Sequence, residues 1–295
     1  MKNFEGIIIK GIGGFYYVES SDGSIYECKA RGAFRKNKMS PYAGDRVLIS
    51  VPDDGYAAIE KIFPRKNQLV RPPIANIDFL VIVASTCDPM PSTLVIDKML
   101  ALAAYKGIEP ILVITKSDIG DEKILNEIYS KVGIRTIVFS ILDQSGAEEI
   151  KKILSNKISA FTGNSGVGKS TLLNCILPGL SLETGDISKK LGRGRHTTRH
   201  IELFKIGDGY IADTPGFSTV DIERYEIIKK DEIQNCFVEF QPYINTCKFT
   251  SCSHMCEKGC SIIEAVKNGE IQRSRYDSYV AMYNEVKDIK DWEIK

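Results

Sequence analysis

One octapeptide near the middle of the chain, Gly163–Ser170, restricts the possible folds more than any other feature. It reads Gly-Asn-Ser-Gly-Val-Gly-Lys-Ser and fits the pattern G-x-x-x-x-G-K-[ST]. An apolar segment, Ile158–Thr162, precedes it, and a segment with helical character, Lys169–Leu177, follows it. Glycines let backbone N–H groups point at phosphate oxygens, and a helix N-terminus favours an anion. The octapeptide therefore predicts a phosphate-binding loop in an α/β domain.

The residues of this loop have expected roles. We expect Lys169 to reach the β- and γ-phosphates of a nucleotide and to act in catalysis, and the Ser170 hydroxyl to coordinate Mg²⁺. The residues expected to contact the nucleotide from this segment are Gly163, Asn164, Ser165, Gly166, Val167, Gly168, Lys169, Ser170 and Thr171.

Apolar segments and helical segments alternate from residue 77 onward. Buried apolar strands joined by helices indicate a parallel α/β sheet. Helices are expected near Leu94–Lys106, Glu122–Val132, Ala147–Leu154 and Lys169–Leu177, and strands at Phe79–Ala84, Ile111–Thr115, Thr136–Ser140, Ile158–Thr162, Ile201–Ile206 and Tyr210–Asp213.

A second motif, Thr115-Lys116-Ser117-Asp118, follows one of these strands and resembles the N-K-x-D motif of GTPases. The Asp118 carboxylate can accept both the N1–H and the exocyclic N–H of guanine, a donor pair that adenine lacks. The aliphatic part of Lys116 can cover the base. Thr115 takes the place of Asn, and its hydroxyl supplies fewer hydrogen bonds than an amide. Ser140 lies where GTPases have Ser-Ala beside the base, with Ile141 in place of Ala.

A third motif, Asp213-Thr214-Pro215-Gly216, follows the strand near Tyr210. Asp213 can hold Mg²⁺ through water, and the Gly216 N–H can meet the γ-phosphate. The base-reading motif therefore precedes the phosphate loop along the chain, whereas a standard GTPase has the opposite order. The sheet can be the same, because neighbouring strands need not be neighbours in sequence.

The first 66 residues form a β-rich segment. The strands expected here are Ile7–Ile9, Phe15–Val18, Ile25–Lys29 and Val47–Val51. Turn residues separate them, and about five short strands in such a segment suit a small barrel such as the OB-fold. Tyr16, Tyr17 and Phe34 are expected either to stack on bases or to fill the barrel core.

Basic residues gather in two segments although the net charge of the chain is only +1. They indicate either contacts with a polyanion or solvated faces. The first segment has Lys29, Arg31, Arg35, Lys36, Lys38 and Arg46, and the second has Lys189, Lys190, Arg193, Arg195 and Arg199.

Four metal-ligand side chains lie close together near the C-terminus, at Cys247, Cys252, His254 and Cys260. Three thiolates and one imidazole suit a tetrahedral structural Zn²⁺ ion. Cys256 is a fifth candidate that could compete with His254. We expect one ion, in a helical domain that starts near residue 226.

With these motifs in place, the chain resembles the circularly permuted GTPases that act in maturation of the bacterial small ribosomal subunit, called ribosome small subunit-dependent GTPase A. Cys28–Gly32 and Pro41–Val47 resemble the OB-fold of that family, and Gly192–Thr198 resembles its switch I. The cysteine cluster resembles its zinc-binding domain, from whose ligand set Cys256 is absent.

The resemblance implies a multidomain protein with an N-terminal OB-fold β-barrel, a central circularly permuted α/β P-loop GTPase domain and a C-terminal helical zinc-binding domain. The expected boundaries are residues 1–66, 67–225 and 226–295. It also implies that Thr198, rather than Thr197, coordinates Mg²⁺ and takes part in catalysis.

The resemblance further implies a GTP hydrolase that acts in late maturation of the small ribosomal subunit, binds its rRNA and is stimulated by it. GTP, GDP, Mg²⁺ and Zn²⁺ are the expected cofactors. Phe217 stands where Ras-like enzymes have a water-orienting Gln, so unaided hydrolysis should be slow. His196 is a candidate for the water-orienting group and equally for a surface contact with rRNA.

Two other functions fit parts of the pattern. One is an RNA-binding assembly protein that uses GTP mainly as a structural switch ligand. The other is an ATP-dependent kinase, against which Asp118 argues. No apolar run approaches the roughly 20 residues of a membrane span, and no secretory signal is expected. We expect a cytoplasmic monomer with no membrane and no DNA partner.

Overall fold

The computed structural model describes residues 2–32, 34, 39–54, 56–178, 201–212 and 226–290. The chain forms two compact units, each built from three separate segments. One unit comprises Met1–Leu80, Ala147–Thr162 and Leu173–Phe217, and the other comprises Val81–Gly146, Gly163–Leu172 and Ser218–Lys295.

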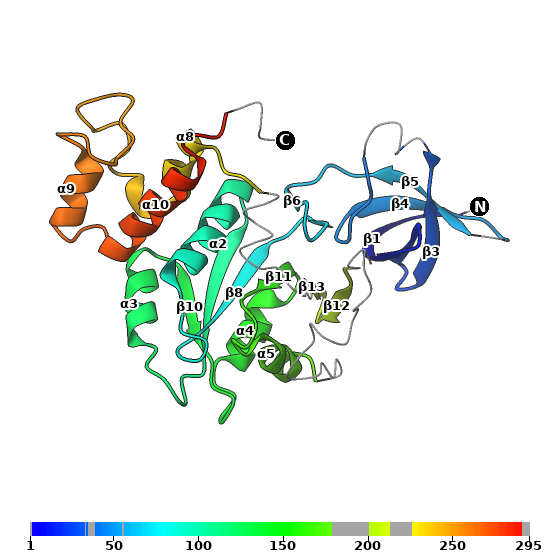
Figure 1. Ribbon diagram of the computed structural model, residues 1–295. Helices are drawn as coiled ribbons and strands as arrows, with labels where there is room; N and C mark the ends of the chain where they lie inside the picture. The colour runs from blue at the N-terminus through cyan, green and yellow to red at the C-terminus, as the bar shows by residue number, and fades with distance from the viewer. Residues whose placement is uncertain are drawn as a thin grey trace. The chain divides into compact units, whose positions relative to one another are not determined.

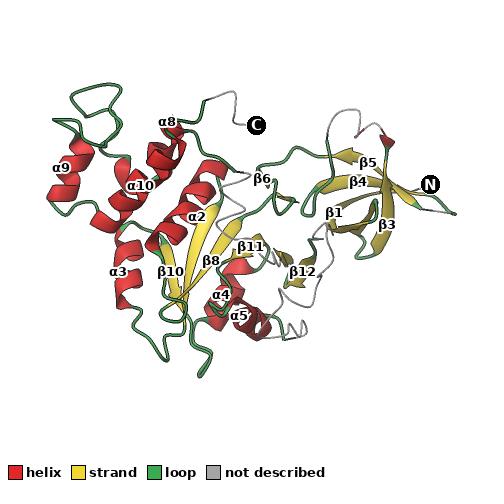
Figure 2. Cartoon of the chain, in the orientation of Figure 1, coloured by secondary structure: helices red, strands yellow, loops and turns green. Residues whose placement is uncertain are grey.

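The N-terminal segment forms a closed barrel of five strands (Figures 1 and 2), which confirms the expected small barrel. The strands pair in the order β1-β2-β3-β5-β4, and only the β3–β5 pair is parallel. Their bounds are β1 (Lys2–Ile12), β2 (Phe15–Ser20), β3 (Ile25–Ala30), β4 (Arg46–Val51) and β5 (Ala57–Ile62). A short ladder of β6 (Gln68–Leu69) and β7 (Ile74–Ala75) follows the barrel in the chain.

The barrel core is made by alternate residues of the strands, as a strand with one buried face requires. Its fully buried members include Ile8, Val18, Cys28, Val47, Ile49 and Ile59. Tyr16 and Phe34 pack against this core, so the core role applies to both. Tyr17 lies on the other face of β2, and its hydroxyl lies 3.4 Å from a Glu27 carboxylate oxygen.

The second sheet has six strands in the order β10-β9-β8-β11-β13-β12. The strands are β8 (Phe79–Ser85), β9 (Glu109–Thr115), β10 (Arg135–Val138), β11 (Ile158–Thr162), β12 (Leu203–Ile206) and β13 (Gly209–Ala212). The β10–β9 and β11–β13 pairs are parallel, as expected. The predicted parallel arrangement does not extend to β12, which is antiparallel to β13. Only Gly207 and Asp208 separate these two strands, and a parallel connection needs a crossover of about a dozen residues.

Within the described residues, four helices lie between these strands, and they confirm the expected alternation. They are α2 (Thr93–Lys106), α3 (Lys123–Lys131), α4 (Ala147–Leu154) and α5 (Lys169–Ile176). The Ser92 side chain accepts a hydrogen bond from the Val95 N–H at the start of α2, and Gly107 ends the helix in the left-handed conformation.

The C-terminal segment is helical, as expected. It contains α8 (Lys230–Ile233), the 3₁₀ turns η1 (Gln234–Cys236) and η2 (Val238–Phe240), α9 (Ser261–Lys267) and α10 (Arg273–Val286). Phe237, Phe240 and Tyr279 form its buried centre, with ring centroids 5.0 to 5.7 Å apart. Ala101 of α2 belongs to the same apolar cluster. Among the described residues, no helix combines the length and apolar character that crossing a bilayer requires.

Candidate functional site

The glycine-rich loop between β11 and α5 adopts a conformation that only glycine tolerates at its first residue. Gly163 has φ 155°, and a Cβ atom there would lie 2.5 Å from the Val83 carbonyl oxygen. Val167 is buried, whereas Asn164, Ser165 and Gly166 are exposed. The loop is thus held against the end of β8 while its outer residues remain open to a ligand.

The Thr115 side chain joins the end of β9 to this loop. Its hydroxyl oxygen lies 2.5 Å from the Val167 carbonyl oxygen and 3.2 Å from that of Ala84. Thr115, Val167 and Ala84 are all buried, so water has little access to these hydrogen bonds. A hydroxyl group supplies fewer hydrogen bonds than the Asn amide found at this position in the N-K-x-D motif. The Thr115 hydroxyl nevertheless reaches the phosphate loop.

The segment after β8 contacts both the base-reading motif and the phosphate loop. The sequence predicts no role for this segment. The Thr86 hydroxyl donates to the Lys116 carbonyl oxygen at 2.8 Å, and the Lys116 ammonium group donates to the Asp88 carbonyl oxygen. Pro89 faces the phosphate loop, since a Cβ on Gly166 would lie 3.5 Å from its Cδ atom. The available signal was position: this segment follows the carboxyl end of an apolar strand, where α/β sheets bind ligands.

Asp118 presents one oxygen that lacks a partner. Its Oδ1 atom is buried and accepts no hydrogen bond from any described residue. A buried acceptor without a donor is costly and rare in a folded protein. A guanine edge offers the N–H groups that this oxygen lacks, so the residues present fit the expected base.

Ser140 lies just beyond β10, in the loop next to the base-reading motif. It is buried, and its hydroxyl oxygen accepts the Leu142 N–H at 3.2 Å. The Ser117 hydroxyl donates to the Phe139 carbonyl oxygen at 3.3 Å, so the two loops touch. Ile141 is exposed.

The structure brings the base-reading residues Thr115, Lys116, Asp118 and Ser140 together with the loop Gly163–Gly168. Lys169, Ser170 and Thr171 lie in the first turn of α5 and are half-buried. The remaining candidate residues of the nucleotide site, His196, Thr198, Asp213 and Gly216, lie outside the described residues.

The expected metal ligands converge on one point. One ligand atom from each of Cys247, Cys252, His254 and Cys260 lies within 4.8 Å of the others. The Cys247 and Cys260 sulfurs are 3.8 Å apart, and His254 Nδ1 lies 3.6 and 3.4 Å from them. A zinc tetrahedron with Zn–S bonds of about 2.3 Å has edges of about 3.8 Å. The cluster is therefore compatible with tetrahedral Zn²⁺.

The surroundings of His254 suit a metal ligand. Its Nε2 atom lies 2.8 Å from the Gln234 side-chain oxygen, to which it can donate, leaving Nδ1 free for the metal. Burial lowers the pKa of His254, which favours the neutral ring. The Tyr276 hydroxyl donates to the His254 carbonyl oxygen at 2.8 Å.

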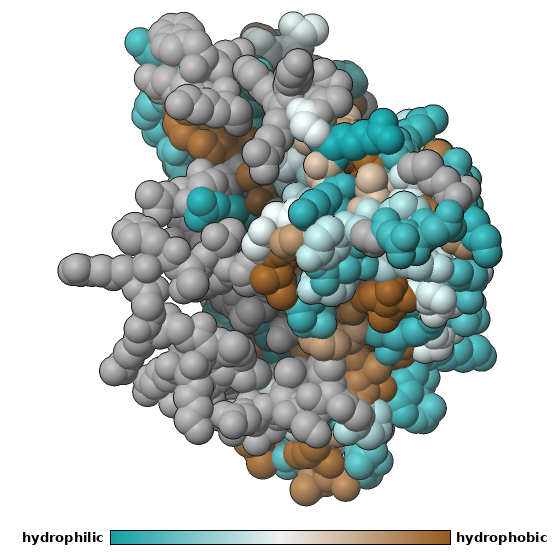
Figure 3. Space-filling view, turned by 90° about the vertical axis from the view of Figure 1, so that its right-hand side faces the viewer, coloured by the Kyte–Doolittle hydropathy of each residue, from teal (hydrophilic) through white to brown (hydrophobic). Residues whose placement is uncertain are grey.

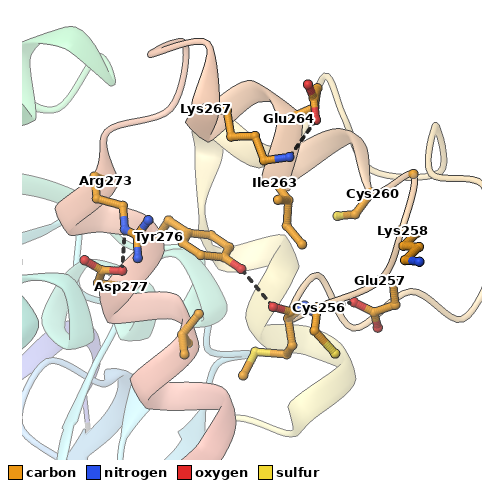
Figure 4. A pocket seen from close by; sticks show the side chains of 13 residues that line it. Cys256, Glu257, Lys258, Cys260, Ile263, Glu264, Lys267, Arg273, Tyr276 and Asp277 are labelled. Carbon is orange, nitrogen blue, oxygen red and sulfur yellow. Dashed lines mark hydrogen bonds and ion pairs between the residues drawn. The ribbon is translucent and has the colours of Figure 1, made fainter.

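Cys256 does not belong to the group of converging ligands. It is exposed and lines a surface pocket next to the cluster (Figure 4). The neighbouring Glu257 turns back to accept hydrogen bonds from Ser253 and from the Met255 and Cys256 N–H groups. Burial alone would raise its pKa, but the hydrogen bonds from Ser253 and from the Cys256 N–H lower the pKa of Glu257 to about 2. The segment between His254 and Cys260 is thereby held with Cys256 pointing away.

Comparison with protein families gives two matches. Residues 62–223 match the RsgA GTPase family, and residues 5–59 match the RsgA N-terminal domain. Two relatives are named small ribosomal subunit biogenesis GTPase RsgA. The one from Ruminiclostridium cellulolyticum is 43% identical, over 98% of this chain and 96% of the relative. The one from Geobacillus kaustophilus is 44% identical, over 97% and 98% of the two chains.

Two solved structures resemble the chain over nearly all of its length. YjeQ from Thermotoga maritima has a TM-score of 0.84 and 37% identity, covering 98% of this chain and all of its own. YloQ, described as a circularly permuted GTPase, has a TM-score of 0.81 and 35% identity, covering 98% and 96%.

Proposed function

The chain belongs to the RsgA GTPase family, and we propose that this GTP-hydrolysing enzyme acts in late maturation of the small ribosomal subunit. The observation that carries the choice of nucleotide is the buried, unpartnered Oδ1 atom of Asp118. It lies on the motif that the Thr115 hydroxyl ties to the phosphate loop. We propose domain boundaries at residues 1–66, 67–225 and 226–295.

In the proposed nucleotide site, one group of residues binds the base and a second group binds the phosphates. Asp118 accepts the N1–H and N2–H of guanine, Lys116 covers the base, and Ser140 lies beside it. The loop from Gly163 to Thr171 surrounds the phosphates. Lys169 neutralises the developing charge on the β- and γ-phosphates during hydrolysis.

Mg²⁺ neutralises phosphate charge when it is bound, and Ser170 is one of its proposed ligands. Thr198 is the other proposed ligand, Asp213 holds the ion through water, and the Gly216 N–H meets the γ-phosphate. These three assignments rest on motif spacing and on the family resemblance.

Orientation of the attacking water is the step that the chain does not complete alone. Phe217 occupies the position of the water-orienting Gln, and phenylalanine offers no hydrogen bond to water. We propose that binding to the small subunit orders the site and that His196 orients the water. The GTP form binds the subunit, and hydrolysis releases the protein.

The cluster of three cysteines and one histidine holds one structural zinc ion in this proposal. Four protein ligands leave no open position for a catalytic water. The ion stabilises a C-terminal domain whose apolar core is small.

The barrel contacts rRNA through its basic residues, among which Lys29 and Arg31 are exposed. Arg35, Lys36 and Lys38 belong to the same proposal but lie outside the described residues. A factor that works on ribosomal subunits is placed in the cytoplasm, and we propose a monomer that binds neither DNA nor membranes.

The deciding experiment is phosphate release from GTP against the concentration of purified small subunits. We expect slow release by the wild-type protein alone, a saturable increase with subunits, and no increase for Lys169→Ala. Phosphate release that ignores the subunits would contradict the proposal. Subunit binding without any phosphate release would instead favour an assembly protein that uses GTP as a structural ligand.

A further inference from the structure

Two aromatic rings and one ammonium group meet on the outside of the barrel, and we call Phe15, Lys29 and Tyr56 the ring cluster. Phe15 begins β2, and Lys29 lies directly opposite it on β3. The ring centroids of Phe15 and Tyr56 are 5.3 Å apart. The Lys29 ammonium nitrogen lies 5.0 Å from the first centroid and 4.4 Å from the second.

The packing of the barrel does not account for these side chains. Phe15 alternates with Tyr16, which packs on the core, so Phe15 lies on the outer face of β2. Tyr56 is 56% exposed, and Lys29 is exposed as well. In the view from the barrel side, hydrophobic residues form small patches among hydrophilic ones rather than one apolar face (Figure 3). The exposed Tyr56 ring, held beside Phe15 and a cation, offers a flat apolar surface to a planar ligand.

A hollow of about 360 Å³ adjoins the ring cluster, lined by Phe15, by the turn before it and by Pro41 and Tyr42, among others. Its volume falls in the range of small-ligand clefts, roughly 300–1,000 Å³. Gly13 and Gly14 form the turn with φ 61° and 86°, and a Cβ on either would meet no atom within 4 Å. The backbone at this edge is therefore open to close approach.

The chemistry of the ring cluster favours a nucleobase next to a phosphate. Base stacking on tyrosine or phenylalanine needs an exposed ring face, and an adjacent ammonium group neutralises the backbone. Arg31 adds a second cation, with its side chain 57% exposed although paired with Glu60. Glu27 lies farther along the same face, opposite Tyr17, so the positive end is at Lys29 and Arg31.

The position of the ring cluster on the barrel also favours a nucleic-acid ligand. The ring cluster combines the β1–β2 turn, the β2–β3 face and the β4–β5 connection, from which Tyr56 comes. These are the surfaces on which OB-folds hold oligonucleotides. We propose that the ring cluster stacks an unpaired base of single-stranded RNA. The inference rests on the proposed function, since it names a contact for the RNA-binding barrel.

The test is binding of a labelled single-stranded oligoadenylate to the full chain, measured by fluorescence anisotropy. Tyr56→Ala should weaken binding roughly 5- to 100-fold, and Tyr56→Phe should retain it, because the ring and not the hydroxyl stacks. Lys29→Gln should lower the slope of log affinity against log salt by about one. Tyr56 is exposed on a connection, and an unchanged melting temperature shows that its variants fold.

Tyr105→Ala is the matched control, because Tyr105 is 41% exposed and also has a lysine ammonium group near its ring, at 5.6 Å. Its affinity for oligoadenylate should equal that of the wild type. Equal binding by Tyr56→Ala and wild type overturns the inference, as does an equal loss in Tyr105→Ala. Capture of a proline-rich peptide that needs Tyr56, with no oligoadenylate effect, also overturns it.

The proposed function and the ring cluster can fail separately. GTP hydrolysis by the wild type that ignores small subunits contradicts the first. A loss of oligoadenylate binding confined to the ring-cluster variants supports the second in either case.

Discussion

The hydroxyl group of Thr115 lies 2.5 Å from the carbonyl oxygen of Val167, 52 residues farther along the chain. The first residue belongs to the base-reading motif and the second to the phosphate loop. A buried hydrogen bond thus joins the two motifs that, in the proposed function, hold opposite ends of one nucleotide. The permuted chain order preserves this contact, because the two segments follow β9 and β11, which lie on either side of β8 in one sheet.

Removal of that hydroxyl should weaken nucleotide binding. Thr115→Val has nearly the same shape but removes the hydroxyl that donates to the Val167 carbonyl oxygen, and a buried acceptor left unpaired costs about 1–3 kcal/mol. We expect GDP affinity to fall roughly 5- to 100-fold, measured with a fluorescent GDP analogue. Thr136→Val is the control, since the Thr136 hydroxyl donates to the carbonyl oxygen of Ile134, which lies just before β10, and does not contact the phosphate loop in any described hydrogen bond. Equal affinities of the two variants would show that the contact is not needed.

Exchange of the Asp118 carboxylate should change the base that is bound. Asp118→Asn replaces one carboxylate oxygen by an N–H₂ donor. This donor faces the N–H groups of guanine and cannot accept from them, whereas it can donate a hydrogen bond to the oxygen that xanthine carries in place of the guanine amino group. Hydrogen bonds to a charged group contribute about 1.5–3 kcal/mol each, so GDP affinity should fall at least about 100-fold. Xanthosine diphosphate should become the better ligand. Competition between the two diphosphates measures this preference, and retained selectivity for GDP would remove Asp118 from the base site.

The predictable parts of the fold are those that leave a local pattern. The turns near Gly13 and Gly23, with alternating strands between them, indicated the barrel, but its parallel β3–β5 pair joins segments that no local pattern connects. The antiparallel pairing of β12 was missed because the apolar pattern of a strand does not distinguish parallel from antiparallel pairing. The short turn at Gly207 was the available signal.

The residues that the structure brings together at the candidate nucleotide site were predicted where they belong to a recognised motif, as at Gly163–Gly168 and Thr115–Asp118. Thr86 and Asp88 were missed because backbone carbonyl groups and a lone hydroxyl form no recognisable pattern. The sequence left open whether Cys256 or His254 is the fourth ligand. The choice depends on the path of the backbone between His254 and Cys260, which Glu257 fixes by accepting hydrogen bonds from backbone N–H groups. Spacing alone could not decide it.

Zinc should depend on the converging cysteines and not on Cys256. We expect about one zinc ion per chain in the wild type and in Cys256→Ser, and a large loss in Cys260→Ser, measured by metal analysis after dialysis. Cys260 is buried among the ligands, whereas Cys256 is exposed, so the two variants form a matched pair. Gln234→Ala should retain the ligands but weaken zinc affinity about 10- to 100-fold, because it removes the partner of His254 Nε2. Zinc loss in Cys256→Ser would return that residue to the ligand set.

Arg275 should be the most costly arginine to remove among those that the structure describes with ion pairs. It is buried in α10, where its guanidinium group bonds Asp97 at 2.6 Å and Glu239 at 2.7 Å. Burial would lower the pKa of Arg275, but these two carboxylates raise it, so the group stays charged.

The expected cost follows from the two acids that the change leaves behind. Arg275→Met fills similar space with an apolar chain and leaves Asp97 and Glu239 buried without their cation, which should lower the free energy of unfolding by about 3–5 kcal/mol. Arg273→Met, two residues earlier on α10, breaks a pair whose side chains are 76% and 55% exposed and should cost under about 1 kcal/mol. Urea unfolding of both variants, followed by circular dichroism, measures the difference. Equal midpoints would mean that the buried acids take up protons or rearrange at little cost, and that the contact between α2 and α10 depends on apolar packing around Ala101 instead.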